Sequence, residues 1–134
     1  MKKLIISFFI GFISLAAIGS IFANFIFLPK FAEWHQLHPD VVRATLDPLS
    51  GALQAIIQLI GLVVLVDRMK MTKLIDGAVL GAIYSAGIWL IVDLNMVALT
   101  TFVDYNFVVM DAVISAVIGG VGGAVVTWSQ NKFA

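Results

Sequence analysis

Long apolar runs dominate the chain, and most polar residues fall between them. Four runs, 4–28, 49–66, 77–99 and 107–128, are long enough to cross a bilayer as helices, which takes about 20 residues each. Apolar and polar side chains do not alternate along these runs, as they would in the strands of a membrane β-barrel. The pattern therefore predicts an all-α, four-helix transmembrane bundle that forms a single domain, 1–134, with the first span closed by Pro29.

Composition agrees with a membrane protein and excludes several other classes. The chain is 61% hydrophobic and 12% charged, whereas a soluble domain is about 45–50% apolar and about 25% charged. The formal net charge is +0, so there is no basic field that would attract nucleic acid. Because the chain has no cysteine, disulfides, thiolate metal sites and a cysteine nucleophile are excluded. We expect no cofactor and no bound metal.

The positive charges predict how the bundle is oriented. Cytoplasmic segments of membrane proteins carry an excess of Lys and Arg, and four spans place both termini and the 67–76 loop on one side. That side holds six of the eight cations, namely Lys2, Lys3, Arg68, Lys70, Lys73 and Lys132. We therefore expect a multi-pass membrane protein with both termini in the cytoplasm; the resemblance described below implies the bacterial inner membrane. The first run is longer than a signal-peptide core of about 7–15 residues, so we expect it to be retained as an anchor.

The outer loop, 29–48, has a helical pattern of its own. Its apolar residues recur every three or four positions, at Phe31, Trp34, Leu37, Val41 and Val42, followed by Thr45. Such an amphipathic segment can lie on the outer membrane surface, with Trp34 at headgroup depth, or it can pack against the bundle. The pair at 39–40, Pro then Asp, is expected to open a helical turn. We interpret His35 and His38 as surface histidines, because a four-ligand metal site needs more than this pair.

Small residues mark the faces on which the last two helices should meet. Gly77, Gly81 and Ser85 are spaced four apart in the third run, and Ser115, Gly119 and Gly123 are spaced four apart in the fourth. Small side chains let membrane helices approach closely. The same glycines would also suit a homo-oligomer, and the sequence leaves both alternatives open.

Polar residues inside the spans converge on the outer leaflet. Asp93 lies about 9 Å and Asp111 about 6 Å inside the outer ends of their runs, at 1.5 Å rise per residue. The sequence predicts a polar pocket that opens to the outside and is built from Asp93, Asp111, Asn95, Gln54, Gln58 and Asn24. Paired carboxylates there could bind a cation, share a proton or recognise an amine headgroup. The structural alternative is that the amides hydrogen-bond across helix seams and that Asp111, in the first turn of its helix, interacts with the helix dipole.

One segment, 77–128, carries a recognisable combination of motifs. A glycine-rich start at 77–81 with Tyr84 is followed by Asp-Leu-Asn-Met-Val-Ala-Leu-Thr-Thr at 93–101, by Asp111, and by a glycine-rich close at 119–124 with Trp128. This segment resembles small bacterial four-helix inner-membrane proteins of unknown function. In such proteins the position of Asn95 is usually threonine. The resemblance implies that the two aspartates belong to one shared pattern, but it brings no assigned activity.

Three function classes follow from the sequence. The first is an accessory or scaffold subunit that packs into a larger membrane complex through its glycine faces. The second is a small oligomeric cation- or proton-coupled transporter or channel that uses Asp93 and Asp111. The third is an outward-facing lipid or small-molecule binding protein. The chain has no HExxH, GxSxG or P-loop motif and no GxGxxG in a strand-to-helix setting, so we expect no enzyme. The expected partners are the bilayer and either a second copy or a larger membrane protein.

Overall fold

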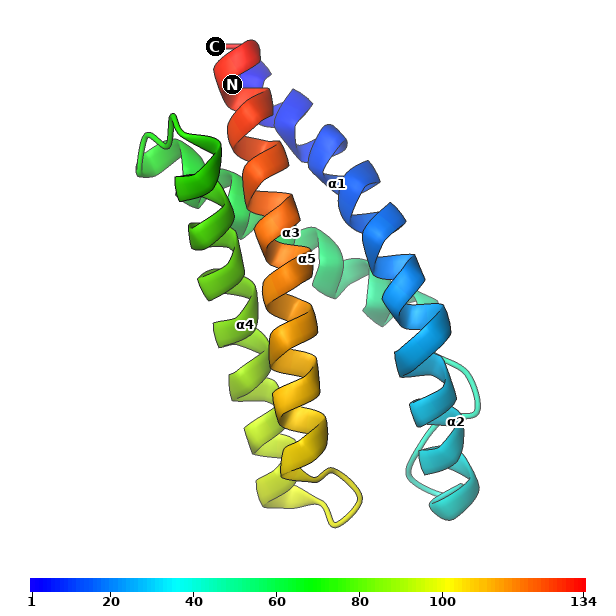
Figure 1. Ribbon diagram of the computed structural model, residues 1–134. Coiled ribbons are helices and arrows are strands. Elements are labelled where there is room, and N and C mark those ends of the chain that lie inside the picture. The colour runs from blue at the N-terminus through cyan, green and yellow to red at the C-terminus, as the bar shows by residue number, and fades with distance from the viewer.

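The computed structural model describes all 134 residues and contains only helices (Figure 1). The elements are α1 (Lys2–Phe22), the π-helix η1 (Ala23–Phe27), α2 (Leu28–Leu37), α3 (Pro48–Arg68), α4 (Leu74–Leu99) and α5 (Tyr105–Lys132). α1, η1 and α2 join into one helical rod, Lys2–Leu37. This rod and the three remaining helices are long and apolar enough to cross a membrane. The predicted all-α, four-helix fold class is confirmed, and the chain is a multi-pass membrane protein.

Pro29 does not end the first helix, contrary to the sequence-based expectation. Proline has no N–H to donate, and its ring presses on the carbonyl four residues back, which here belongs to Phe25. The π-helix η1 lies over this carbonyl, and the N–H of Leu28 donates to Ala23, five residues earlier. This wider turn accommodates the proline within a continuous rod. The first helix therefore extends nine residues past the predicted end at Leu28 (37 − 28 = 9).

Aspartates cap the first residues of the second and fourth spans, α3 and α5. Asp47 caps α3 and accepts hydrogen bonds from the hydroxyl and the backbone N–H of Ser50. These two donors hold the pKa of Asp47 below its ordinary value. Asp104 caps α5 and accepts from the N–H of Phe107 at 2.9 Å. Because α5 starts at Tyr105, Asp111 lies in its second turn, and Asp104 occupies the N-cap where the helix dipole favours an anion.

The predicted turn at 39–40 forms, but it does not continue into a helix. The carbonyl of His38 accepts hydrogen bonds from the N–H groups of Val41 and Val42, at 3.2 and 3.0 Å. α2 ends at Leu37, and the residues after this turn stay non-helical until Asp47. The helical spacing of the outer loop therefore continues the first helix only as far as Leu37. The residues Val41, Val42 and Thr45 lie beyond the helical part of this loop.

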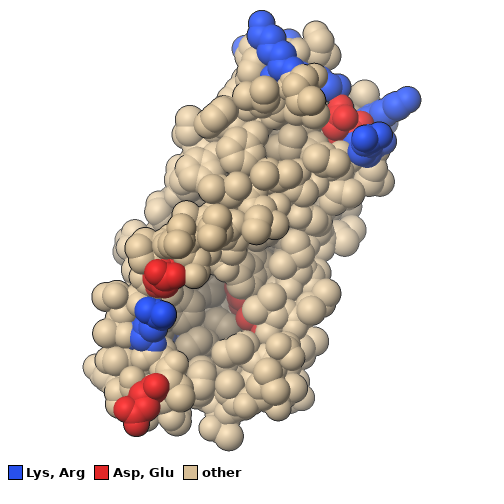
Figure 2. All heavy atoms as spheres, turned by 180° about the vertical axis from the view of Figure 1, so that it is seen from behind, with Lys and Arg blue, Asp and Glu red and all other residues tan.

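The two ends of the bundle differ in what they contain. Figure 1 shows both chain termini at one end, together with the loop between α3 and α4; we call this the termini end. α2 and the loop between α4 and α5 lie at the opposite end, the loop end. Lys and Arg side chains gather at the termini end, and the middle of the molecule is almost free of charge (Figure 2). The structure thus groups the charged segments as the sequence pattern predicts.

α4 and α5 lie antiparallel with their backbones in direct contact. A Cβ atom on Gly81 would overlap the carbonyl of Gly119, and a Cβ on Gly123 would overlap the carbonyl of Gly77. Ser85 lies against Gly119 in the same row. Packing of this kind is how helices associate in lipid, where burial of apolar surface gives no advantage. These small residues hold the last two helices together within one chain.

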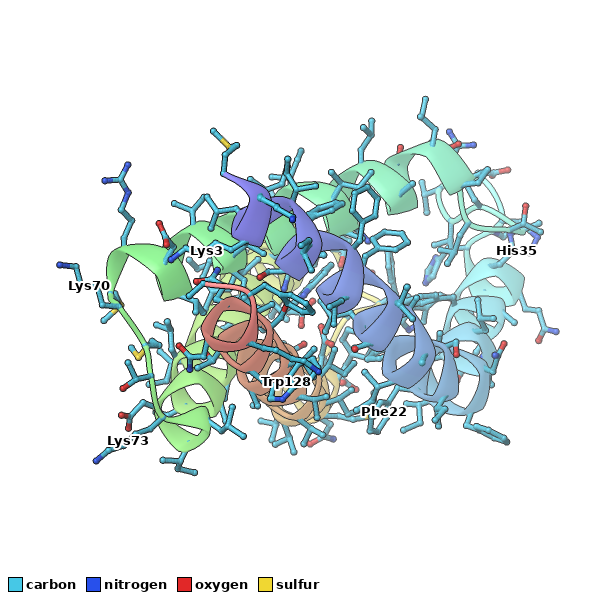
Figure 3. The ribbon with its side chains drawn as sticks, turned by 90° about the horizontal axis from the view of Figure 1, so that it is seen from above. Lys3, Phe22, His35, Lys70, Lys73 and Trp128 are labelled. Atoms are coloured by element: carbon cyan, nitrogen blue, oxygen red, sulfur yellow. The ribbon has the colours of Figure 1, made fainter.

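The termini end of the bundle is filled and tied by polar contacts. Its core consists of Leu59, Leu62, Val63, Val66 and Val126, and α1 approaches it at Gly11. The buried side chain of Gln130 donates to the carbonyl of Val63 at 2.9 Å, and Asn131 donates to the carbonyl of Thr72 at 2.8 Å. Lys3, labelled in Figure 3, pairs with Asp67 at 2.9 Å. This end therefore joins all four spans firmly.

The seam makes a direct prediction about stability. Gly81→Ala and Gly119→Ala should each lower the unfolding free energy by about 1–3 kcal/mol, because the added methyl group meets backbone that cannot yield. Gly87→Ala in α4 is the matched control, since a Cβ there meets nothing within 4 Å. The measurement is equilibrium unfolding of the purified protein in mixed detergent micelles. Equal stability of all three variants would show that the backbones are not in contact.

Candidate functional site

A cavity opens where the bundle spreads apart toward the loop end. Its volume is about 410 Å³, and all four spans contribute to its walls. This lies within the range of about 300–1,000 Å³ that small-molecule sites occupy. Figure 2 shows a hollow on the flank of the molecule with acidic atoms at its floor, and Asp93 and Asp111 are the acidic residues that line the cavity.

The floor of the cavity carries two buried carboxyl groups from neighbouring helices. Asp93 of α4 is 5% exposed and Asp111 of α5 is 7% exposed, and the two groups are close enough to interact directly. Asp111 accepts a hydrogen bond from the hydroxyl of Ser115 at 3.3 Å. The Oδ2 atom of Asp93 is buried and accepts no hydrogen bond from any other donor of the chain, and only a proton shared with the adjacent carboxyl group of Asp111 would satisfy it from within the protein. Burying such an atom is costly unless something pairs with it, so this oxygen points to a ligand or a proton.

A polar contact joins α3 to α4 at the inner end of the cavity. Gln58 donates to the hydroxyl of Ser85 at 3.2 Å, and the hydroxyl of Tyr84 donates to the carbonyl of Gln58 at 2.9 Å. Gly61 leaves the space that the Tyr84 hydroxyl fills. Gln54, one turn nearer the loop end, also lines the cavity and is exposed. The two glutamines therefore belong to one face of α3, as their spacing predicts.

The wall opposite the acids is apolar and comes entirely from the rod. Its residues follow one another at intervals of four and then three, namely Leu15, Gly19, Ala23, Phe27, Phe31 and Trp34. Four residues of an α-helix turn about 40° more than one full turn, so such a row slowly drifts around the helix. The π-helix η1 rotates less per residue and counteracts this drift. The turn that accommodates Pro29 thus also helps to keep the row facing the cavity.

Aromatic side chains close the cavity at the loop end. The ring of Trp34 lies 4.8 Å from the ring of Phe107 and 5.5 Å from that of Phe102, measured between centroids. Trp34, Val103 and Phe107 form a buried cluster, and all three also line the cavity. Of the two sequence-based alternatives for the outer segment, the structure has Trp34 packed against the bundle.

Two of the predicted pocket residues lie elsewhere. Asn24 and Asn95 are exposed, and neither lines the cavity. Asn95 is two residues from Asp93, which places it about 200° around the helix, so the same turn cannot present both side chains to one cavity. The predicted pocket was grouped by depth along the spans, and depth alone does not determine the face of the helix on which a residue lies.

Helix geometry would have found the residues that the sequence analysis missed. Trp89 precedes Asp93 by four positions and Ser115 follows Asp111 by four, so each pair shares a face, and all four residues line the cavity. Ser115 was assigned to helix packing alone. The rings of Phe27 and Phe31 stack at 6.0 Å, but the unbroken rod that aligns them is not evident from the chain, because Pro29 signals a helix end.

The two histidines of the outer segment each contact a nearby residue. His35 Nδ1 lies 2.6 Å from the carbonyl oxygen of Val42. The ring of His38 lies 5.2 Å from the ring of Phe102. No group of three or more His, Cys, Asp or Glu side chains is arranged to hold a metal ion.

Comparisons with known proteins add no family to this description. No family model, curated protein or solved structure matches the chain. The resemblance of 77–128 to small four-helix inner-membrane proteins stays an expectation that rests on its motifs. The functional argument therefore rests on the geometry of the cavity.

Cysteine accessibility tests whether the cavity is open. Ser115→Cys introduces the only thiol into a chain without cysteine, at a 6% exposed position in the cavity wall. We expect a small cationic methanethiosulfonate to modify it about tenfold faster than an anionic one, because two carboxylates lie nearby. Ser7→Cys is the control, since Ser7 is fully buried against Ser129 outside the cavity. Equal rates at the two cysteines would contradict an accessible cavity.

Proposed function

We propose that the protein is an outward-facing binding protein for an organic cation, with Asp93 as the main counter-ion. The observation that carries this proposal is the unpartnered, buried Oδ2 atom of Asp93 in a cavity that also contains Asp111. An ionised carboxyl in such surroundings needs a positive partner or a proton. A ligand ammonium group supplies both charge and N–H donors to these oxygens. The proposed role is binding, without catalysis.

The other cavity walls favour an organic cation over a metal ion. Ca²⁺ takes six to eight oxygen ligands and Mg²⁺ demands octahedral coordination, whereas the cavity offers two carboxylates and no third acid nearby. Aromatic side chains, including Trp89, Phe27 and Phe107, line the same space. Ring faces attract ammonium groups, most strongly where water is excluded. This combination suits a cation that carries apolar substituents.

Two alternative functions lose support from the geometry. A channel through one copy needs a continuous route across the bundle, and the packed core of Leu59, Leu62 and Val126 fills the termini end; a transporter would need this core to open in a second conformation. A scaffold subunit was inferred from free glycine faces, but Gly77, Gly81, Gly119 and Gly123 are used within the chain. The exposed apolar side chains that remain suit lipid contact, so we retain the bilayer as the principal partner.

We further propose that the termini end faces the cytoplasm of a bacterial cell. The support is the gathering of Lys and Arg at that end (Figure 2), which is the usual cytoplasmic bias. The cavity then belongs to the outer half of the inner membrane. A ligand would reach it from the outside or from the outer leaflet.

The binding proposal predicts discrimination by charge. Octylamine should change the fluorescence of the cavity tryptophans at concentrations at which octanol, of equal chain length, has no saturable effect. Asp93→Asn should weaken octylamine binding about tenfold or more, because truncating one partner of a buried charge pair costs about 2–5 kcal/mol. Asp76→Asn is the control, because Asp76 is an exposed acid at the other end of α4. Equal binding of amine and alcohol would refute the proposal.

Orientation can be tested with two further single-cysteine variants. Thr101→Cys lies in the exposed loop between α4 and α5, and Ala134→Cys is at the chain end. In intact spheroplasts, a membrane-impermeant maleimide should label only the cysteine at position 101, because the loop end faces outside. Lysis should expose the cysteine at position 134. The reverse pattern would invert the proposed topology.

A further inference from the structure

We infer that the organic cation taken by this cavity is a long-chain amphiphile, an ammonium headgroup with an alkyl tail. The inference rests on the proposed function for its headgroup site and adds the class of ligand. It places the ammonium group between Asp93 and Asp111 and the tail along the apolar wall of the rod.

The first support is the distribution of polar groups in the cavity. Its hydroxyl, amide and carboxyl groups come from α3, α4 and α5, and include Gln58, Ser85 and Asp93; the same helices also contribute apolar residues such as Leu59 and Trp89. The α1–η1–α2 rod contributes apolar residues only. A small hydrated amine would leave this apolar surface facing water or empty space. An amphiphile matches both the polar groups and the apolar surface.

The second support is the position of the opening. The aromatic cluster of Trp34, Val103 and Phe107 covers the loop end of the cavity, whereas the hollow lies on the flank in Figure 2. α3 crosses the bundle obliquely in Figure 1 and is held to α4 by the contacts between Gln58 and Ser85 and between Tyr84 and Gln58. Charged side chains lie beside this hollow in Figure 2, so an amphiphile whose headgroup is at the membrane surface can enter the cavity from the side.

The third support is unfilled room on the apolar wall. Gly19 lines the cavity, and a Cβ atom built there meets nothing within 4 Å. Ala23, one turn further along, adds only a methyl group. At this level the wall therefore leaves the width that an alkyl chain needs. Gly11, by contrast, lies against Leu59 and Val126 in the closed end, so the space begins where the rod leaves the core.

The test fills that space without touching the acids. Gly19→Leu places a branched side chain in the tail region, and Gly87→Leu is the matched control, because Gly87 also has open space around it but does not line the cavity. Each full-length protein is reconstituted in lipid nanodiscs and titrated with butylamine and with dodecylamine. Membrane partitioning of each amine cancels when variants are compared in the same nanodiscs.

Gly19→Leu should weaken dodecylamine binding about tenfold, in line with the penalty for a mismatched apolar group in a pocket. The same variant should leave butylamine binding within about twofold, and Gly87→Leu should change neither. If Gly19→Leu weakens both amines equally, or neither, while the wild type binds them, the long-chain inference is wrong and the cation site stands. If the wild type binds neither amine, the proposed function itself fails.

Discussion

Direct backbone contact between α4 and α5 is the constraint on which the rest of the structure depends. On α4 the row Gly77, Gly81 and Ser85 continues at intervals of four to Trp89 and Asp93. On α5 the facing row runs back from Gly123 and Gly119 through Ser115 to Asp111 and Phe107. Glycines hold the helices together in one part of each row, and the same rows then change to large and acidic residues at the cavity. The seam thus places the two acids side by side.

The bundle separates two tasks along its length. The termini end contains the fully buried Leu59, Leu62 and Val66, together with the hydrogen bond from Gln130 to Val63. The free energy gained by this packing offsets the cost of burying a carboxylate without a partner at the other end. The loop end gives up close packing and gains space, polar groups and aromatic rings. Proteins commonly depart from close packing and full hydrogen bonding at a functional site and compensate elsewhere in the fold.

Much of the fold could be predicted from the sequence because bilayer thickness and helix periodicity constrain it directly. The lengths of the four apolar runs predicted the four spans. The four-residue spacing of Gly77, Gly81 and Ser85 identified one face of α4. The helix end predicted at Pro29 was wrong. Whether a proline ends a helix depends on whether a π-turn can accommodate the lost hydrogen bond, and this depends on the packing of the whole rod. Buried Ser129 and Gln130 were likewise missed, because depth along a helix does not tell which polar residues face a neighbour.

The candidate site was predictable in its centre and not at its edges. Asp93, Asp111, Gln54 and Gln58 all line the cavity, because an acid or amide within a span is expensive unless it faces the interior. Asn24 and Asn95 can be exposed within their helices, because an amide costs less to place in a span than a charge does. The apolar wall could not be predicted at all, because Phe27, Phe31 and Trp34 look like any lipid-facing residues until it is known that the helix continues past Pro29.

The rod is also the element that determines the width of the cavity. At the termini end it is fastened by Gly11 against Leu59 and by Ser7 against Ser129. At the loop end it reaches α5 mainly through aromatic rings, with Phe27 6.2 Å and Trp34 4.8 Å from Phe107 between centroids. The separation between the apolar wall and the acids therefore depends on ring size and ring orientation, which can change without unfolding a helix. The α4–α5 seam thus fixes the position of the two acids, and the ring contacts of the rod fix how far the apolar wall stands from them.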